Sequence, residues 1–241
     1  MPRAFTPKPA GRSSGQKTGQ KTGKGRARPS SGSDLPKEIR EELQRVTRPT
    51  QVSDASSRLS RAIELLERGD SGAAVAEGMK AKALSPRAAS VREVLGLALY
   101  GQERWREALA EMKTYKRISG RPDQNHIIAD CLRALGKPAE AVPLAEEELK
   151  AKVPNSAKAE AVVVAASALA DQGRYPEALA FLGRARTRAD VAEDYTLRLW
   201  YVKGDILARA GRRREAEIEF RKIMRHDAGA FDVAERLADL G

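Results

Sequence analysis

Residues that could perform chemistry are few and scattered in this chain of 241 residues. The only histidines, His126 and His226, lie far apart in the sequence, and Cys131 is the only cysteine. A metal site needs clustered ligands, and a lone thiol offers neither a disulfide nor a zinc framework. Cys131 stands among apolar residues and should be buried, whereas His226 should be exposed near a helix end. We expect no metal, no cofactor and no small-molecule substrate.

A glycine-rich fragment, residues 19–25, invites comparison with a phosphate-binding loop. Its spacing is wrong, because Thr18 stands where the first glycine belongs and Gly25 stands where Ser or Thr must bind magnesium. Acidic pairs such as Glu146 and Glu147 are typical of solvated helix faces. Since no nucleophile, base and acid come together in the sequence pattern, we expect a non-catalytic protein.

The net charge of +11 is located mainly in residues 1–32, which contain eight basic residues and no Asp or Glu. This leaves 36 basic against 33 acidic residues for the remainder of the chain. Because residues 1–32 are rich in Gly, Ser and Pro, we expect a disordered tail, which could be an electrostatic tether or a solubilising arm. Possible phosphate contacts are Lys17, Lys21, Lys24, Arg26, Arg28, Arg212, Arg213 and Arg214.

The composition of the remaining residues favours an all-α fold. Aromatic residues make up only 5% of the chain, so its core must consist of aliphatic and small side chains. A first helix is expected after Ser33 or Asp34, with Pro36 in its first turn and Leu43 and Val46 on one face. No apolar run is long enough for a membrane helix or a secretory signal, so we expect a cytoplasmic, membrane-free protein.

Helical segments separated by short breaks recur from about residue 54. Each second helix begins with an alanine, and these alanines are 34, 33, 37 and 38 residues apart: Ala74, Ala108, Ala141, Ala178 and Ala216. Twelve residues before them stand small residues: Ala62, Gly96, Ala129, Ala166 and Gly204. Nine before stand leucines: Leu65, Leu99, Leu132, Leu169 and Leu207. Five before stand Gly69, Glu103, Gly136, Gly173 and Gly211, of which only Glu103 is not a turn-forming residue.

These columns resemble the bacterial-type tetratricopeptide repeat, a helix–turn–helix unit of about 34 residues. The matching residues are Leu95, Gly96, Trp200, Trp105, Tyr175, Phe220 and Pro86. Pro138 and Arg213 depart from the family at the aromatic position after the turn. The resemblance implies a right-handed helical-hairpin solenoid of about five units. We expect a tail (1–32), a helix and linker (33–53), and a repeat domain (54–241) with units near 54–86, 88–121, 122–154, 156–190 and 194–228 and a capping helix near 230–240.

The resemblance also implies that first helices line a concave groove. The inward positions are Glu93, Leu97, Tyr100, His126, Asp130, Arg133, Val163, Ser167, Arg198, Tyr201, Asp205 and Ala208. Tyr100 and Tyr201 would be rigid anchors for a partner, although these positions could equally be ordinary surface residues. Asp130 and Asp205 argue against the family's binding of acidic chaperone C-termini.

We therefore expect a non-catalytic scaffold that binds a protein or peptide segment in this groove. The alternative is a nucleic-acid- or ribosome-associated adaptor whose basic tail supplies non-specific electrostatic binding.

Overall fold

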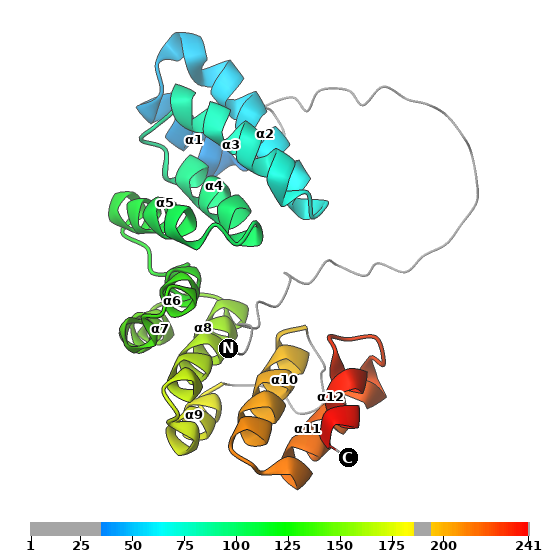
Figure 1. The fold of residues 1–241 in the computed structure, drawn as a ribbon. Helices are drawn as coiled ribbons and strands as arrows, with labels where there is room; N and C mark the ends of the chain where they lie inside the picture. The colour runs from blue at the N-terminus through cyan, green and yellow to red at the C-terminus, as the bar shows by residue number, and fades with distance from the viewer. Residues whose placement is uncertain (1–34, 186–193, 241) are drawn as a thin grey trace, which may run out of the picture. The chain divides into compact units, whose positions relative to one another are not determined.

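The computed structural model describes residues 35–185 and 194–240, which form helices and turns without a strand (Figure 1). The expected all-α class and its repeated helical hairpins are confirmed. The predicted tail, residues 1–32, lies outside the described residues. Residues 35–120 and residues 121–240 belong to two compact units, which are treated separately below.

The unit of residues 35–120 holds two helical hairpins preceded by one further helix. Its elements are α1 (Lys37–Val46), a short 3-10 helix η2 (Pro49–Gln51), α2 (Val52–Glu67), α3 (Ser71–Leu84), α4 (Ala89–Gly101) and α5 (Trp105–Ser119). Helices α2 and α3 form the first hairpin and α4 and α5 the second, and α3 packs on α4. Since one hairpin cannot bury its apolar face alone, the stacking of the two supplies the core of this unit.

The unit of residues 121–240 has the same plan with three hairpins. Its elements are α6 (Asn125–Ala134), a 3-10 helix η3 (Pro138–Glu140), α7 (Ala141–Lys150), α8 (Asn155–Asp171), α9 (Tyr175–Leu182), α10 (Asp194–Arg209), α11 (Arg213–His226) and α12 (Val233–Leu240). The first helices α6, α8 and α10 pack side by side, and α12 packs on α11. This order places three first helices next to one another, which matters for the site described below.

The sequence columns form the interior of the hairpins. All five column alanines are completely buried: Ala74, Ala108, Ala141, Ala178 and Ala216. The two column glycines lie where a second helix crosses closely. A Cβ on Gly96 would lie 2.3 Å from the Met112 sulfur, and one on Gly204 would lie 2.8 Å from the Phe220 ring. Small residues at these positions are therefore a packing requirement.

The turn between the helices of each hairpin uses a left-handed residue. Gly69, Gly136, Gly173 and Gly211 have φ values from +75° to +77°. Glu103 occupies the same position and has φ +56°, so the hairpin of α4 and α5 makes the turn without a glycine. Left-handed backbone is strained for a residue with a Cβ, so this turn is the costliest of the five.

Helix α1 is part of the folded unit, although the sequence assigned it only to a linker region. Leu35 and Leu43 are buried in one cluster with residues of the first hairpin. The Glu42 carboxylate accepts hydrogen bonds from the backbone N–H groups of Ala89 (2.5 Å) and Ser90 (3.2 Å), which open helix α4. A negative charge at a helix N-terminus satisfies unpaired donors and the helix dipole, so α1 closes this end of the unit.

Candidate partner-binding site

A small hollow opens between the first helices α6, α8 and α10. Its empty volume is about 220 Å³, part of it open solvent. The residues that line it are Asp130, Arg133, Val163, Val164, Ser167, Arg198 and Val202. Five of these seven are positions that the sequence pattern placed on the concave groove: Asp130, Arg133, Val163, Ser167 and Arg198. The three valines give the hollow an apolar floor, and the other four residues give it a polar margin.

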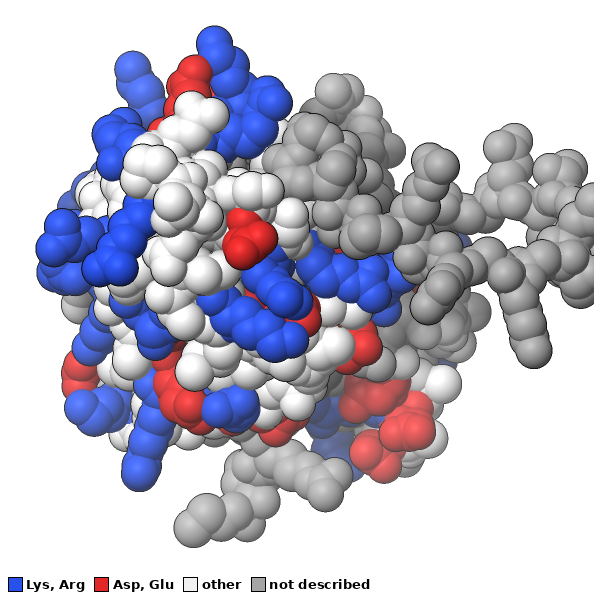
Figure 2. Space-filling view, turned by 90° about the horizontal axis from the view of Figure 1, so that it is seen from above, with Lys and Arg blue, Asp and Glu red and all other residues white. Residues whose placement is uncertain are grey.

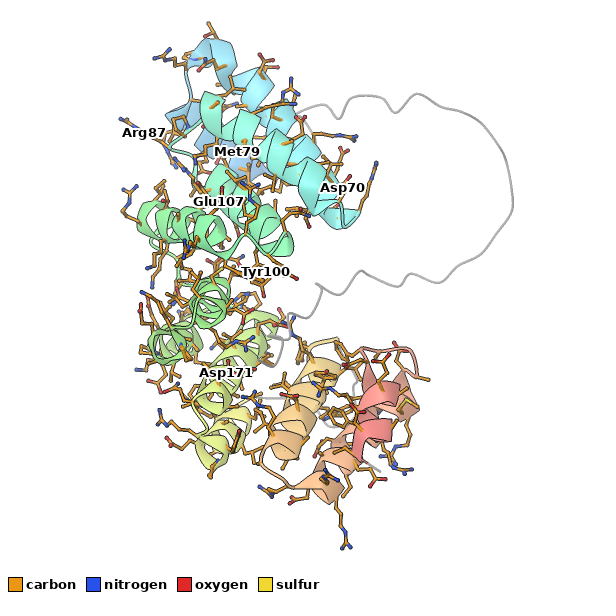
Figure 3. The ribbon with its side chains drawn as sticks, in the orientation of Figure 1. Asp70, Met79, Arg87, Tyr100, Glu107 and Asp171 are labelled. Atoms are coloured by element: carbon orange, nitrogen blue, oxygen red, sulfur yellow. The ribbon has the colours of Figure 1, made fainter. Side chains whose placement is uncertain are left out.

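The margin on α6 is an ion-paired arginine. Arg133 donates from Nε to Asp130 at 2.9 Å and from Nη1 to Asp171 at 2.9 Å, and Asp171 lies at the end of α8 (Figure 3). Burial by itself lowers the pKa of the Arg133 guanidinium, but the charges of Asp130 and Asp171 outweigh burial and raise its pKa. Arg133 therefore stays charged and links two consecutive hairpins.

The same chain of charges continues to helix α10. Arg209 donates to Asp171 at 3.1 Å and to the Ala170 carbonyl at 2.9 Å, so it also satisfies a carbonyl at the end of α8. On α10 itself, Arg209 lies 3.7 Å from Asp205. Alternating acids and bases thus connect the C-terminal ends of α6, α8 and α10. Such a network fixes the register of neighbouring hairpins more than it adds stability.

Arg198 is the polar residue of the hollow with unused hydrogen-bonding capacity. Its Nη1 lies 3.1 Å from Glu160, a residue of α8. Its Nε is buried and has no hydrogen-bond partner among the described residues. A buried charged donor without an acceptor is costly, and a bound oxygen atom would relieve the cost. Ser167, half-buried on α8, brings a hydroxyl group to the same hollow.

Tyr201 is not a groove anchor, and the prediction that it would contact a partner is wrong. Its side chain is 0% exposed, because residues leading into and on α12 cover it. The hydroxyl donates to Asp232 at 2.6 Å and accepts from Arg236 at 3.3 Å, and the ring lies 4.9 Å from that of Phe231. Burial raises the pKa of the Tyr201 hydroxyl, and its hydrogen bond to Asp232 raises it further. Asp205 is likewise held by Arg236 at 2.8 Å.

His126 is also turned to a structural use that the sequence pattern did not indicate. Its Nδ1 lies 2.8 Å from one oxygen of Glu148, and its backbone N–H donates to the other at 2.8 Å. Glu148 comes from α7 and its side chain is completely buried. The imidazole thus faces the second helix of its own hairpin, where Glu148 also caps the start of α6.

Comparison with known proteins agrees with the repeat pattern. Residues 127–226 match the family model described as tetratrico peptide repeat. The chain carries tetratricopeptide repeats. None of the curated proteins compared with the chain matches it.

Solved structures similar to this chain also contain these repeats. The Thermus thermophilus tetratricopeptide-repeat protein TTC0263 is 17% identical, with a TM-score of 0.64 over 77% of this chain and 98% of that one. YrrB, described as a tetratricopeptide-repeat protein with an unusual peptide-binding site, is 20% identical, with a TM-score of 0.52 over 82% and 96%. Human IFIT1, in a dimer with m7Gppp-AAAA, is 14% identical, with a TM-score of 0.60 over 84% and 50%. At these identities the likeness concerns the fold alone.

The remaining predicted groove residues lie apart from the hollow. Glu93, Leu97 and Tyr100 are half-buried on α4 in the unit of residues 35–120, and Ala208 is half-buried on α10. The Tyr100 ring packs edge-on against Trp105 at 5.3 Å between centroids, which supports the turn between α4 and α5 (Figure 3). The repeat register therefore gave the inward side of each first helix but not which of its residues are accessible.

Residues with chemical potential take structural positions in the tetratricopeptide repeats. Cys131 is buried as expected, and burial raises the pKa of its thiol to about 12. His226 is exposed at the end of α11 as expected, with its ring 5.3 Å from that of Trp200. In the described ranges, no three His, Cys, Asp or Glu side chains gather as metal ligands would. Nor does any helix described there have the length and apolarity needed to cross a membrane.

The basic run at the start of α11 is only partly available for phosphate contacts. Arg212 is ion-paired with Glu215 at 2.6 Å, whereas Arg213 and Arg214 are exposed. The other predicted phosphate contacts, Lys17 to Arg28, lie outside the described residues.

Proposed function

We propose that this protein is a non-catalytic scaffold that holds a segment of a partner protein against helices α6, α8 and α10. Tetratricopeptide repeats form a protein-interaction scaffold, because stacked hairpins present a rigid extended surface. Within that scaffold, the hollow lined by Val163, Ser167 and Arg198 is the proposed contact point.

The observation that carries this proposal is the buried Arg198 Nε without an acceptor at the margin of the hollow, as far as the described residues go. A backbone carbonyl or a side-chain carboxylate of the segment would supply the missing acceptor, and hydrogen bonds to charged groups are the stronger kind. Apolar atoms of the same segment would contact Val163 and Val202. The likeness to YrrB, which is described as having a peptide-binding site, supports a peptide as the ligand.

Helix α12 limits where the segment can bind. Because residues in and before α12 engage Tyr201 and Asp205, contact with α10 is proposed through Arg198, nearer the start of that helix. Tyr201, which the sequence suggested as an anchor, has no part in the proposed site.

The test begins with selection of binding peptides from a displayed random library, with the full chain as bait. Binding of the selected peptides is then measured for Ser167→Phe, which fills the hollow, and for Ala180→Phe. Ala180 is exposed on α9, outside the hollow, and serves as the matched control. We expect at least a tenfold loss of affinity for Ser167→Phe and none for Ala180→Phe. Equal affinity for both variants would contradict the proposed site.

A second function, an adaptor associated with nucleic acid or ribosomes, remains a proposal that rests on charge. Residues 1–32 carry eight basic residues without an acid, and Arg213 and Arg214 are exposed. Such binding would be independent of sequence and would weaken steeply with salt. A shallow salt dependence of nucleic-acid affinity would count against it.

A further inference from the structure

Helix α5 carries three cations in a row on its solvent face. Arg106, Lys113 and Arg117 are all exposed, with the exposed Ala110 between the first two. At 3.6 residues per turn they fall within a wedge of about 40°, and at 1.5 Å per residue the row is about 16 Å long. The helix buries its opposite side, so the row points away from the hairpin core.

These three cations have no acidic partner among the described residues, whereas the acids of α5 are already engaged. Glu107 is ion-paired with Arg104 at 2.7 Å (Figure 3). Glu111 is nearly buried and accepts from Lys82 at 2.5 Å and from Arg92 at 2.7 Å. The row is therefore a local excess of positive charge, not one half of a set of surface ion pairs.

Packing does not require charge at these positions, as the other hairpins show. The equivalent residues on α3 are Gly72, Met79 and Ala83, and those on α7 and the turn before it are Ala139, Glu146 and Lys150. On α11 all three are again basic: Arg214, Arg221 and Arg225. There, however, Arg221 is bonded to Glu217 at 2.6 Å. Of these four second helices, α5 and α11 carry cations at all three positions, and in the described part of the chain only α5 leaves all three uncompensated.

The charge of the whole unit strengthens the field of this row. Residues 35–120 contain 16 Lys and Arg and 12 Asp and Glu. Figure 2 shows that basic side chains outnumber acidic ones on the face seen from above, over this unit. The chain that precedes α1 adds the eight basic residues of positions 1–32. A clustered basic surface of this kind attracts polyanions.

We propose that the row of Arg106, Lys113 and Arg117 binds the phosphate backbone of duplex nucleic acid. A duplex carries one negative charge per about 1.7 Å of its axis, so a straight row about 16 Å long meets several phosphates at once. Single strands are typically held by stacking of their bases on aromatic rings. The exposed face of α5 has no aromatic residue, since Tyr115 is buried and Trp105 packs against Tyr100. Recognition is therefore by backbone charge and independent of sequence.

The test measures binding of the full chain to a labelled 20-base-pair duplex over a range of salt concentrations. The variant Arg106→Gln, Lys113→Gln, Arg117→Gln is compared with a control of equal charge. The control is Arg104→Gln, Arg174→Gln, Arg212→Gln, which removes three exposed cations that are ion-paired with glutamates. Thermal unfolding followed by circular dichroism verifies that both variants fold.

We expect the α5 variant to lose about two to three units of the slope of log affinity against log salt, and tenfold or more in affinity at about 0.1 M salt. The control should keep a slope within one unit of wild type. Equal slopes for the two variants, or no duplex binding at low salt, would overturn the proposal. Tighter binding of the corresponding single strand, or equally tight binding of poly-L-glutamate, would also overturn it. The row and the hollow involve different residues, so either proposal can fail alone.

Discussion

The strained turn at Glu103 offers a quantitative test of the repeat geometry. Glu103 has φ +56°, while the four equivalent residues are glycines with φ from +75° to +77°. Left-handed backbone costs a residue with a Cβ about 1–2 kcal/mol. Replacement by glycine removes this cost but adds about 0.5–1 kcal/mol of unfolded-state freedom. We expect Glu103→Gly to stabilise the protein by about 0.5–1 kcal/mol.

The matched control is Gly69→Ala, because both residues belong to the unit of residues 35–120. A Cβ at Gly69 would meet no atom within 4 Å, so its effect comes from the backbone alone. We expect this variant to lose about 1 kcal/mol.

Urea unfolding followed by circular dichroism measures both changes. With a slope of about 1–3 kcal/mol/M, the midpoint should rise by a few tenths molar for Glu103→Gly and fall by a similar amount for Gly69→Ala. A lower midpoint for Glu103→Gly would refute the idea that this position is strained.

Three further predictions follow from named contacts. Tyr201→Phe should lower the free energy of unfolding by about 1–2 kcal/mol, since its hydroxyl donates to Asp232; an unchanged urea midpoint would contradict this. Glu42→Ala should cost about 1–2 kcal/mol through loss of the cap on α4, whereas Glu41→Ala, at an exposed ion pair, should cost under about 0.5 kcal/mol; equal midpoints in urea would argue against the cap. Cys131 should resist a thiol reagent at pH 8 until urea unfolds the chain, because burial raises its pKa to about 12. Its contribution to stability is present below about pH 9 and is lost as the pH rises towards 12; rapid native-state labelling would contradict the assigned burial.

The hairpin architecture follows from sequence because its requirements are local and repeated. A close helix crossing needs a small residue, so Gly96 and Gly204 mark the crossings within the sequence itself. The turn column was predictable for the same reason, and its exception at Glu103 is a non-glycine residue held in left-handed backbone.

The accessible part of the site was harder to predict because it depends on contacts between distant residues. The register placed Tyr201 on the inward side of α10, but Asp232, on the segment before α12, covers it from 31 positions later. His126 is likewise held by Glu148 of the next helix, 22 positions away. No local pattern signals either contact. A polar residue pair shared between the end of the last hairpin and α12 was the nearest available indication.

The capping role of α1 was missed for a related reason. Glu42 is one of several acids on a short helix, and its partners lie 47 and 48 residues further on. Only the folded arrangement distinguishes it from its solvated neighbours. The hydrophobic face with Leu43 indicated a helix, but not the surface on which it packs.

Position-specific photocrosslinking tests the central claim most directly. A benzoylphenylalanine probe is placed at residue 167, in the hollow, or at residue 180, on the exposed face of α9, and the full chain is irradiated in its native cells. The account predicts that the probe at residue 167 captures one partner protein that the probe at residue 180 does not. Capture of the partner only from residue 180, or no capture from residue 167, would contradict a partner segment held against α6, α8 and α10.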